Sequence, residues 1–199
     1  MKIHKILQEI KFNEFISIDL ETTGLNSDKD EIIEISAIRF VNGEIKDEFT
    51  KLIKPTIPIP KKITSITGIN DSMVSNAPKI ADIFQEFLFF LDNKIIVAHN
   101  IDFDISFIER YASDLFLDFK ISGKCDTLNL SRSFFYNFDK FNLEYLSKVF
   151  EFDHSNAHRA RNDAVNSGKL LIKLISQISS MPLSIIDKVR SLCLDNMNN

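Results

Sequence analysis

The chain of 199 residues has only two cysteines and five glycines, no tryptophan and no long apolar run. Its cysteines, Cys125 and Cys193, stand far apart and belong to no Cys-x-x-Cys or Cys/His cluster, which argues against a disulfide framework and against a zinc site. No stretch approaches the ~18 apolar residues of a membrane-spanning helix, and residues 1–11 lack the apolar core of a signal peptide. We therefore expect a cytoplasmic protein without a membrane partner.

Hydrophobic residues are plentiful, at 44% of the chain, and phenylalanine occurs 18 times. Most phenylalanines stand in apolar runs such as residues 84–90, which favours core packing over stacking on nucleic-acid bases. The formal net charge of −4 argues at first against a nucleic-acid partner. Two divalent cations held by carboxylates would bring that charge to zero, so bulk charge does not exclude such a partner.

The order of the predicted elements indicates an α/β fold. Apolar runs predict strands at 15–20 and 95–98, and β-rich segments at 32–40 and 45–53 flank Asn42-Gly43, a strong hairpin signal. Further elements are predicted as helices at 78–92, 103–115, 128–135, 143–150 and 159–175 and as a short strand at 124–126. The prolines of residues 54–60 predict an extended surface connection that faces solvent. A hairpin followed by strands alternating with helices indicates a mixed sheet.

Two segments place acidic residues at the ends of predicted strands. Asp19 and Glu21 are two residues apart, so their side chains project from one face, where they repel each other unless a cation neutralises them. Alternatively, the strand has ended there and both residues are solvated. Asp104 falls in the first turn of the helix after strand 95–98, and open α/β sheets place ligands at such strand ends. Favourable charge at a helix N-terminus is the alternative for Asp102 and Asp104, and it accounts for Asp102, which is expected to face elsewhere.

A third segment carries His158 and Asp163. Five residues of a regular helix turn through ~500°, so the two side chains converge only if His158 precedes the helix. We therefore expect His158 in a loop and Asp163 beside the small residues Ala160, Ala164 and Gly168 at the edge of the core. A lone histidine in this place is otherwise an ordinary surface residue.

Together, the three segments resemble the DEDDh family of 3′-to-5′ exonucleases. The matching motifs are Asp19-Leu20-Glu21-Thr22-Thr23-Gly24, the run from His99 to Asp104 with Asn100 and Phe103, and His158 with Asp163, in the family's order and spacing. The segments 66–69 and 125–128 are also similar, so the resemblance covers residues 12–175. It implies a ribonuclease H-like α/β fold with a mixed five-stranded sheet flanked by helices. We expect an exonuclease domain over residues 1–176 and a C-terminal extension over 177–199, with a short helix and a polar tail.

The resemblance also implies a mechanism. Asp19, Glu21, Asp104 and Asp163 would hold two divalent cations, with Asp19 bridging them, and His158 would serve as general base. A ligand set of oxygens predicts Mg²⁺ or Mn²⁺. In such sites one ion lowers the pKa of the attacking water and the other stabilises the leaving 3′ oxygen, so 5′-mononucleotides are released. Histidine suits the proton transfer because its ordinary pKa lies near neutrality.

Substrate contacts are implied for five residues. The backbone at Thr22 and Thr23 would meet the terminal nucleotide, and Leu25 would wedge against the last base. Asn100 and Phe103 would shape the pocket. Leu25 and Phe103 are equally explained as ordinary packing residues.

Within the family, residues 21–24 and 143–164 are more similar to the epsilon proofreading subunit of bacterial DNA polymerase III and its stand-alone relatives than to oligoribonuclease. DNA is therefore favoured over RNA, with a role in proofreading or repair. A DNA polymerase or a sliding clamp is left open as a partner, because residues 178–183 faintly resemble a clamp-binding peptide, although a helix-ending proline turn explains them too. A non-catalytic nucleic-acid-binding module is the alternative from another class, and the presence of all five active-site residue types argues against it.

Overall fold

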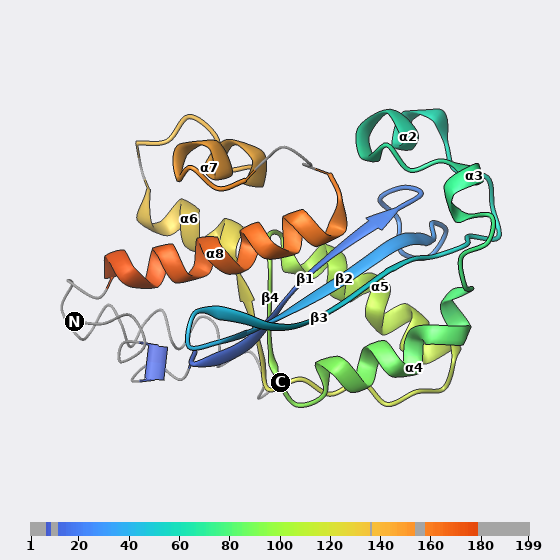
Figure 1. Cartoon of the computed structure of the whole chain (residues 1–199), viewed down its shortest axis with the longest axis horizontal. Helices are drawn as coiled ribbons and strands as arrows, with labels where there is room; N and C mark the ends of the chain where they lie inside the picture. The colour runs from blue at the N-terminus through green and yellow to red at the C-terminus, as the bar shows by residue number, and fades with distance from the viewer. Residues whose placement is uncertain (1–6, 9–11, 136, 154–157, 179–199) are drawn as a thin grey trace.

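The computed structural model describes residues 7–8, 12–135, 137–153 and 158–178 (Figure 1). Within them, five strands form one sheet in the order β3-β2-β1-β4-β5. The strands are β1 (Glu14–Thr22), β2 (Ile32–Val41), β3 (Glu44–Leu52), β4 (Ile95–Ala98) and β5 (Gly123–Asp126). Strand β2 is antiparallel to both of its neighbours, β1 and β3, whereas β4 and β5 run parallel to β1. This mixed sheet confirms the predicted α/β fold class.

Helices cover both faces of the sheet (Figure 1). In the described part of the chain they are α2 (Lys61–Thr67), α3 (Asp71–Val74), α4 (Ile80–Leu91), α5 (Ile101–Asp114), α6 (Thr127–Phe134), α7 (Leu143–Val149) and α8 (Ala160–Ile178). Helix α8 crosses one face and has α6 and α7 packed against it, while α4 and α5 cover the other face. The five predicted helices are confirmed to within a few residues at each end, and α2 and α3 are additional.

Alternate residues of β1 face two separate cores. The residues that face α4 and α5 are Ile16, Ile18 and Leu20. On the α8 side, Phe15 stacks on Phe40 with ring centroids 5.0 Å apart. Gly168 of α8 lies directly against Phe40, since a Cβ added there would come within 2.3 Å of the ring. The glycine therefore lets α8 approach the sheet closely, and the alternation of β1 places Asp19 and Glu21 on this same face.

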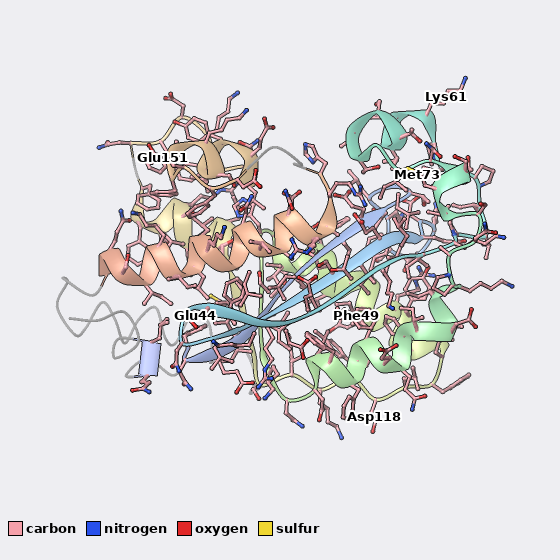
Figure 2. All side chains as sticks on the ribbon, viewed as in Figure 1. Glu44, Phe49, Lys61, Met73, Asp118 and Glu151 are labelled. Atoms are coloured by element: carbon pink, nitrogen blue, oxygen red, sulfur yellow. The ribbon has the colours of Figure 1, made fainter. Side chains whose placement is uncertain are left out.

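The opposite core is rich in aromatic side chains. Phe49 of β3 lies on the α4 side of the sheet (Figure 2), where its ring centroid is 5.6 Å from that of Phe87 and 6.2 Å from that of Phe90. Phe84 is likewise fully buried, next to Phe87 and Tyr111. These contacts confirm the predicted core packing for Phe84, Phe87 and Phe90, but the prediction is wrong for Phe89, which is 83% exposed.

The predicted hairpin and the proline-rich connection are both present. Asn42 and Gly43 adopt positive φ angles of 54° and 86° between β2 and β3, as a tight two-residue turn requires. The connection 54–60 lacks helix and strand, as predicted. Its expected exposure to solvent is wrong for Ile59, which is buried in a small third core and whose N–H donates to Asp71 Oδ1 at 3.0 Å.

In the described part of the chain, no helix is both long enough and apolar enough to cross a membrane. Helix α8 continues through Ile178, two residues past the predicted domain limit at 176. The predicted short helix, the polar tail and all but the first residue of the clamp-like segment 178–183 lie outside the described residues. The division into an exonuclease domain and an extension stays a prediction.

Candidate active site

Carboxylates from β1 and α8 meet at the carboxyl end of β1. One oxygen each from Asp19, Glu21 and Asp163 lies within 4.8 Å of the other two, and these residues are called the carboxylate cluster below. Helix α8 begins over this end of the strand and carries Asp163 in its first turn. Because hard cations hold oxygen ligands at roughly 2.0 to 2.6 Å, three oxygens this close can reach a single ion.

Asp104 flanks the carboxylate cluster without belonging to it. It lies in the first turn of α5 and is 3% exposed. Strand β4 ends at Ala98, short of Leu20, and the Leu20 N–H donates instead to Asp104 Oδ1 at 3.0 Å. Asp102 faces elsewhere, as predicted, and pairs with Lys124 at 2.6 Å.

Burial and mutual repulsion strongly favour the protonated forms of these acids. Burial, together with the charges of Asp104 and Asp163, raises the pKa of Asp19 well above its ordinary value. Burial and the charge of Asp163 raise the pKa of Glu21 to about 8. Burial also raises the pKa of Asp163 to about 6. A divalent cation would relieve the same repulsion, so this site can exchange protons for metal.

His158 lies in the loop before α8, as predicted from its spacing to Asp163. Its backbone has a left-handed conformation, with φ 61°, and its N–H donates to Asp163 Oδ2 at 3.0 Å. The residue is exposed. The backbone bond therefore fixes His158 beside the carboxylate cluster while the imidazole remains accessible to a substrate or to water.

The loop after β1 is stabilised by hydrogen bonds among its own residues and exposes Leu25. Glu31 donates its N–H to the Thr23 hydroxyl at 2.9 Å, and the Thr23 N–H donates to the Glu31 carbonyl at 2.8 Å. The Asp30 carboxylate accepts the Asn26 N–H at 2.9 Å. Leu25 is 86% exposed, so it is not an ordinary packing residue. Thr22 and Thr23 are themselves buried, which leaves mainly the surface of this loop to meet a ligand.

On the other side of β1, the two remaining candidate residues differ in their surroundings. Asn100 is exposed and left-handed, with φ 77° and ψ 54°, and its N–H donates to Asp126 Oδ1 at 3.2 Å. Phe103 is partly buried, with its ring centroid 5.2 Å from that of Phe107. Asn100 thus faces outward at the strand end, whereas Phe103 contributes to the α5 core as well.

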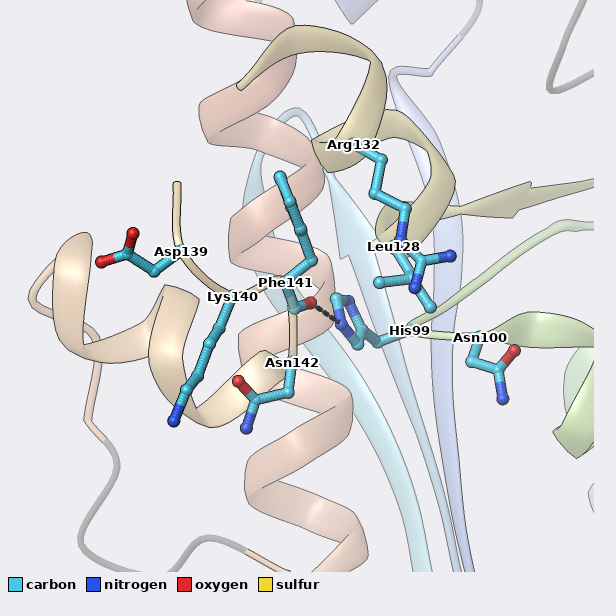
Figure 3. A pocket seen from close by; sticks show the side chains of 8 residues that line it. All are labelled: His99, Asn100, Leu128, Arg132, Asp139, Lys140, Phe141 and Asn142. Atoms are coloured by element: carbon cyan, nitrogen blue, oxygen red, sulfur yellow. Dashed lines mark hydrogen bonds between the residues drawn. The ribbon is translucent and has the colours of Figure 1, made fainter. Parts of the chain in front are cut away.

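A cavity of about 640 Å³ opens beside Asn100 (Figure 3). Its lining consists of His99, Asn100, Leu128, Arg132, Asp139, Lys140, Phe141 and Asn142. The His99 ring is fixed between the Thr127 hydroxyl, 3.0 Å from Nδ1, and the Phe141 carbonyl, 2.7 Å from Nε2. Burial lowers the pKa of His99. Two cationic side chains, Arg132 and Lys140, and one carboxylate, Asp139, line the cavity, and Asn100 is also the N-cap of the helix that carries Asp104.

Several supporting residues were not singled out by the motifs. Glu34 and Arg159 pair beside the carboxylate cluster, and Glu34 interrupts the apolar run of residues 32–35, which is the one local signal for it. Asp126 begins α6 by accepting the Leu128 N–H at 2.8 Å while it also holds Asn100. Asp is a typical N-cap residue, and Asp126 lies two residues before the helix predicted at 128–135, so that role could be found from sequence.

The family model described as Exonuclease (RNase T) matches residues 16–171. The chain belongs to this exonuclease family. It is 37% identical over 182 residues to the PolC-type DNA polymerase III of Caldanaerobacter subterraneus subsp. tengcongensis, covering 92% of the chain but only 13% of that protein. It is 34% identical over 165 residues to the DNA polymerase III subunit epsilon of Aquifex aeolicus, covering 82% of the chain and 81% of that protein.

A solved structure of Escherichia coli exonuclease I in complex with a dA16 oligonucleotide has the same fold. The TM-score is 0.75 at 20% identity, over 90% of the chain and 43% of that protein. Family membership and the epsilon relative confirm the predicted enzyme class, a 3′-to-5′ exonuclease. The predicted likeness to the epsilon subunit is confirmed as well.

Proposed function

We propose that this exonuclease releases 5′-mononucleotides from the 3′ ends of DNA, with Asp19, Glu21, Asp104 and Asp163 as ligands of two divalent cations. The observation that carries the proposal is the convergence of the carboxylate cluster within 4.8 Å at the end of β1. Asp104 is buried alongside and held by the β1 backbone. Oxygen ligands without thiolate favour Mg²⁺ or Mn²⁺.

Each ligand has a place in this proposal. Asp19 would hold the ions together with its neighbours, since the charges of both Asp104 and Asp163 act on its carboxylate. When bound, the ions supply an activated water and stabilise the departing 3′ oxygen. His158 accepts the proton of that water, a role that its exposed ring beside Asp163 permits.

The terminal nucleotide is proposed to lie between the two loops that flank the carboxylate cluster. The backbone at Thr22 and Thr23 meets its sugar, and Leu25 wedges against its base. On the other side, Asn100 and Phe103 close the pocket. The exposure of Leu25, at 86%, and of Asn100 supports these contacts.

The strand upstream of the terminal nucleotide is proposed to enter the cavity beside Asn100. Asn100 of that cavity is the N-cap of α5, which carries Asp104, and the lining includes Arg132 and Lys140. Nucleic-acid phosphates are commonly bound by such cationic side chains. Binding there would keep the strand phosphates away from the negative carboxylates.

DNA is the proposed substrate because the epsilon and PolC-type relatives are named as parts of DNA polymerase III. A role in proofreading or repair and a DNA polymerase as partner belong to the same proposal, as does a cytoplasmic location, which the scarcity of cysteine supports. RNA is the alternative substrate within the family.

The test uses the chain with 5′-labelled DNA and RNA single strands of one sequence, in Mg²⁺, in Mn²⁺ and in EDTA. We expect stepwise shortening of DNA from the 3′ end with either metal, release of 5′-mononucleotides, and no product in EDTA or with Asp19→Asn. Cleavage without metal, or robust cleavage by Asp19→Asn, would contradict the mechanism. Faster cleavage of RNA would favour the alternative substrate, and binding without cleavage would favour a non-catalytic module.

A further inference from the structure

Glu34 is a buried carboxylate next to the carboxylate cluster that the proposed mechanism leaves unused. It stands opposite Glu21 in the antiparallel pairing of β1 and β2 and is 2% exposed. Residues directly opposite in such a pair project from the same face. Glu34 therefore lies under the beginning of α8, beside the proposed metal ligands.

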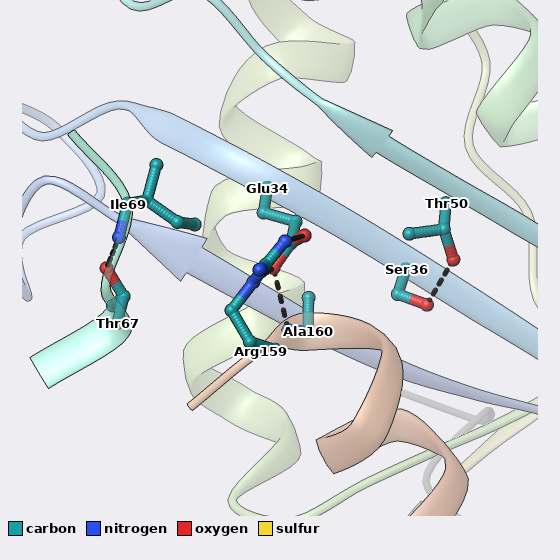
Figure 4. A network of polar contacts seen from close by, with 7 residues as sticks. All are labelled: Glu34, Ser36, Thr50, Thr67, Ile69, Arg159 and Ala160. Atoms are coloured by element: carbon teal, nitrogen blue, oxygen red, sulfur yellow. Dashed lines mark hydrogen bonds and ion pairs between the residues drawn. The ribbon is translucent and has the colours of Figure 1, made fainter. Parts of the chain in front are cut away.

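All hydrogen bonds described for the Glu34 carboxylate come from the segment where α8 begins (Figure 4). Arg159 donates from Nη2 to Oε1 at 2.6 Å and from Nε to Oε2 at 3.0 Å. The Ala160 N–H donates to Oε2 at 2.9 Å. The planar guanidinium grips both oxygens in a fixed orientation, and one free amide of the helix N-terminus is satisfied at the same time.

These bonds from Glu34 to Arg159 and Ala160 hold the part of the chain that carries His158 and Asp163, the two residues of this segment that the mechanism needs. His158 is the preceding residue, and Asp163 lies one helical turn further on, with its N–H bonded to the Arg159 carbonyl at 3.1 Å. A shift of the start of α8 would move both groups relative to Asp19 and Glu21. Arg159 also opposes the charge of Glu34 at the carboxylate cluster, since Glu34 raises the pKa of Glu21 whereas Arg159 lowers it.

We propose that Glu34 and Arg159 are positioning residues, which fix the start of α8 so that Asp163 can ligate metal and His158 can face the attacking water. Neither residue is proposed to touch metal or substrate. The proposal rests on the proposed function and adds a requirement to it: the five residues of the family motifs are insufficient unless this pair aligns them.

Helix α8 offers a matched control two residues further on. Arg161 makes an ion pair with Glu48 of β3, with Nη2 and Nε at 2.7 and 3.0 Å from Oε2. It also connects α8 to the sheet through an Arg–Glu contact, but both side chains are largely exposed, at 49% and 43%. A general effect of loosening α8 from the sheet would appear at both pairs, whereas positioning of the site would appear at Glu34 and Arg159 alone.

The experiment compares wild type with Glu34→Gln, Arg159→Ala, Arg159→Lys, the double variant Glu34→Gln/Arg159→Ala, and Arg161→Ala. Mn²⁺ affinity is measured by titration calorimetry, and kcat is measured at saturating Mn²⁺ on a DNA oligonucleotide. Arg159→Ala is expected to weaken Mn²⁺ binding about 10- to 100-fold, the usual effect of losing a residue that orients metal ligands, and to lower kcat. Arg159→Lys should recover part of both losses, and the double variant should lose little more than the worse single variant.

The midpoint of thermal unfolding is recorded for every variant, so that a folding defect is separated from misalignment. Arg161→Ala is expected to bind Mn²⁺ within about twofold of wild type at a similar midpoint. Unchanged Mn²⁺ affinity and kcat in folded Arg159→Ala would overturn the proposal, as would an equal loss in Arg161→Ala. If Arg159→Ala does not fold, Glu34→Gln and Arg159→Lys decide by the same criteria. Wild type that neither binds Mn²⁺ nor cleaves DNA would overturn the proposed function itself, and this inference with it.

Discussion

At the scale of single residues, His158 and Asp163 are joined by a backbone hydrogen bond, which makes their side-chain roles separable. The donor is the His158 N–H, so the bond survives removal of the imidazole. We expect His158→Ala to lower kcat by about 100-fold or more while Mn²⁺ affinity stays unchanged, because only the general base is lost. Asp163→Ala should weaken Mn²⁺ binding itself. Calorimetry and single-turnover rates measure the two effects, and an equal loss of Mn²⁺ affinity in both variants would contradict the separate roles.

The raised pKa values of Glu21 and Asp163 predict how stability depends on pH. In the folded chain the pKa of Glu21 is about 8 against an ordinary 4.5, and that of Asp163 is about 6 against 3.8. The folded state therefore binds protons more tightly, and this contribution to stability is lost as pH rises through the folded pKa values. Without metal, the temperature at the midpoint of thermal unfolding should decrease as the pH is raised from about 5 to about 8.

Mn²⁺ should reverse that loss at pH 8, where the carboxylates are ready to bind it. At 100 times its Kd the ion would add about 2.7 kcal/mol of stability. Its effect should be smaller at pH 5.5, because protons compete for the same oxygens. Thermal unfolding at the two pH values with and without Mn²⁺ checks this, and Glu21→Gln should flatten the metal-free pH dependence. A metal-free protein equally stable at both pH values would contradict the prediction.

Single residues also mark the limit of what the sequence predicts. Asp19, Glu21 and Asp163 could be identified because their spacing implies a face or a loop, and the structure gathers them at one strand end. Glu34 and Arg159 are 125 residues apart, and no local pattern pairs them. Such a contact follows from the placement of α8 over β2, which depends on packing of the whole domain.

At the scale of elements, the turn from β4 into α5 depends on Asn100. Its left-handed backbone, with φ 77°, is costly for a residue with an ordinary side chain and free for glycine. Asn100→Ala should therefore destabilise the fold by about 1 kcal/mol, whereas Asn100→Gly should preserve it. Both variants should raise KM for DNA, because both lose the proposed substrate contact. Urea unfolding and steady-state kinetics separate the two effects. Equal stability of the variants would argue against strain, and an unchanged KM would argue against the contact.

Helices were predictable where apolar residues recur at helical spacing over several turns. They were harder to predict where an N-cap residue is the main signal. The stripe that includes Ile83, Phe84 and Phe87 identified α4, although the helix begins at Ile80 rather than at Pro78. Helix α3 has four residues, too few for a period, and begins where Asn70 accepts the Met73 N–H at 3.1 Å. Its cap was the available signal, since Asn directly before a helix is a common N-cap.

At the scale of the whole molecule, the cavity lined by Arg132 and Lys140 predicts that longer strands bind better than a single nucleotide. Arg132→Ala should raise KM for an oligonucleotide roughly tenfold, as expected if one charged hydrogen bond worth about 1.4 kcal/mol is lost. Hydrolysis of thymidine 5′-monophosphate p-nitrophenyl ester should be unaffected, because that substrate has no upstream phosphate.

The control for this prediction is Lys120→Ala. Lys120 pairs with Asp118, which Figure 2 shows near α4 and away from α8, so its loss should change neither substrate's kinetics. A loss of activity on both substrates in Arg132→Ala would place its effect on the carboxylate cluster instead. An unchanged KM for the oligonucleotide would remove the cavity from the proposed strand path.

The early end of β4 has one more consequence. This strand pairs with β1 at Ile96 and Val97 and ends at Ala98, so the last residues of β1 have no strand partner on that side. Asp104 instead accepts the hydrogen bond of the Leu20 N–H, which would pair with β4 if that strand were longer. If β4 were two residues longer, it would pair with this amide and displace Asp104 from the site. The length of β4 therefore matters for activity even when every charged side chain is retained.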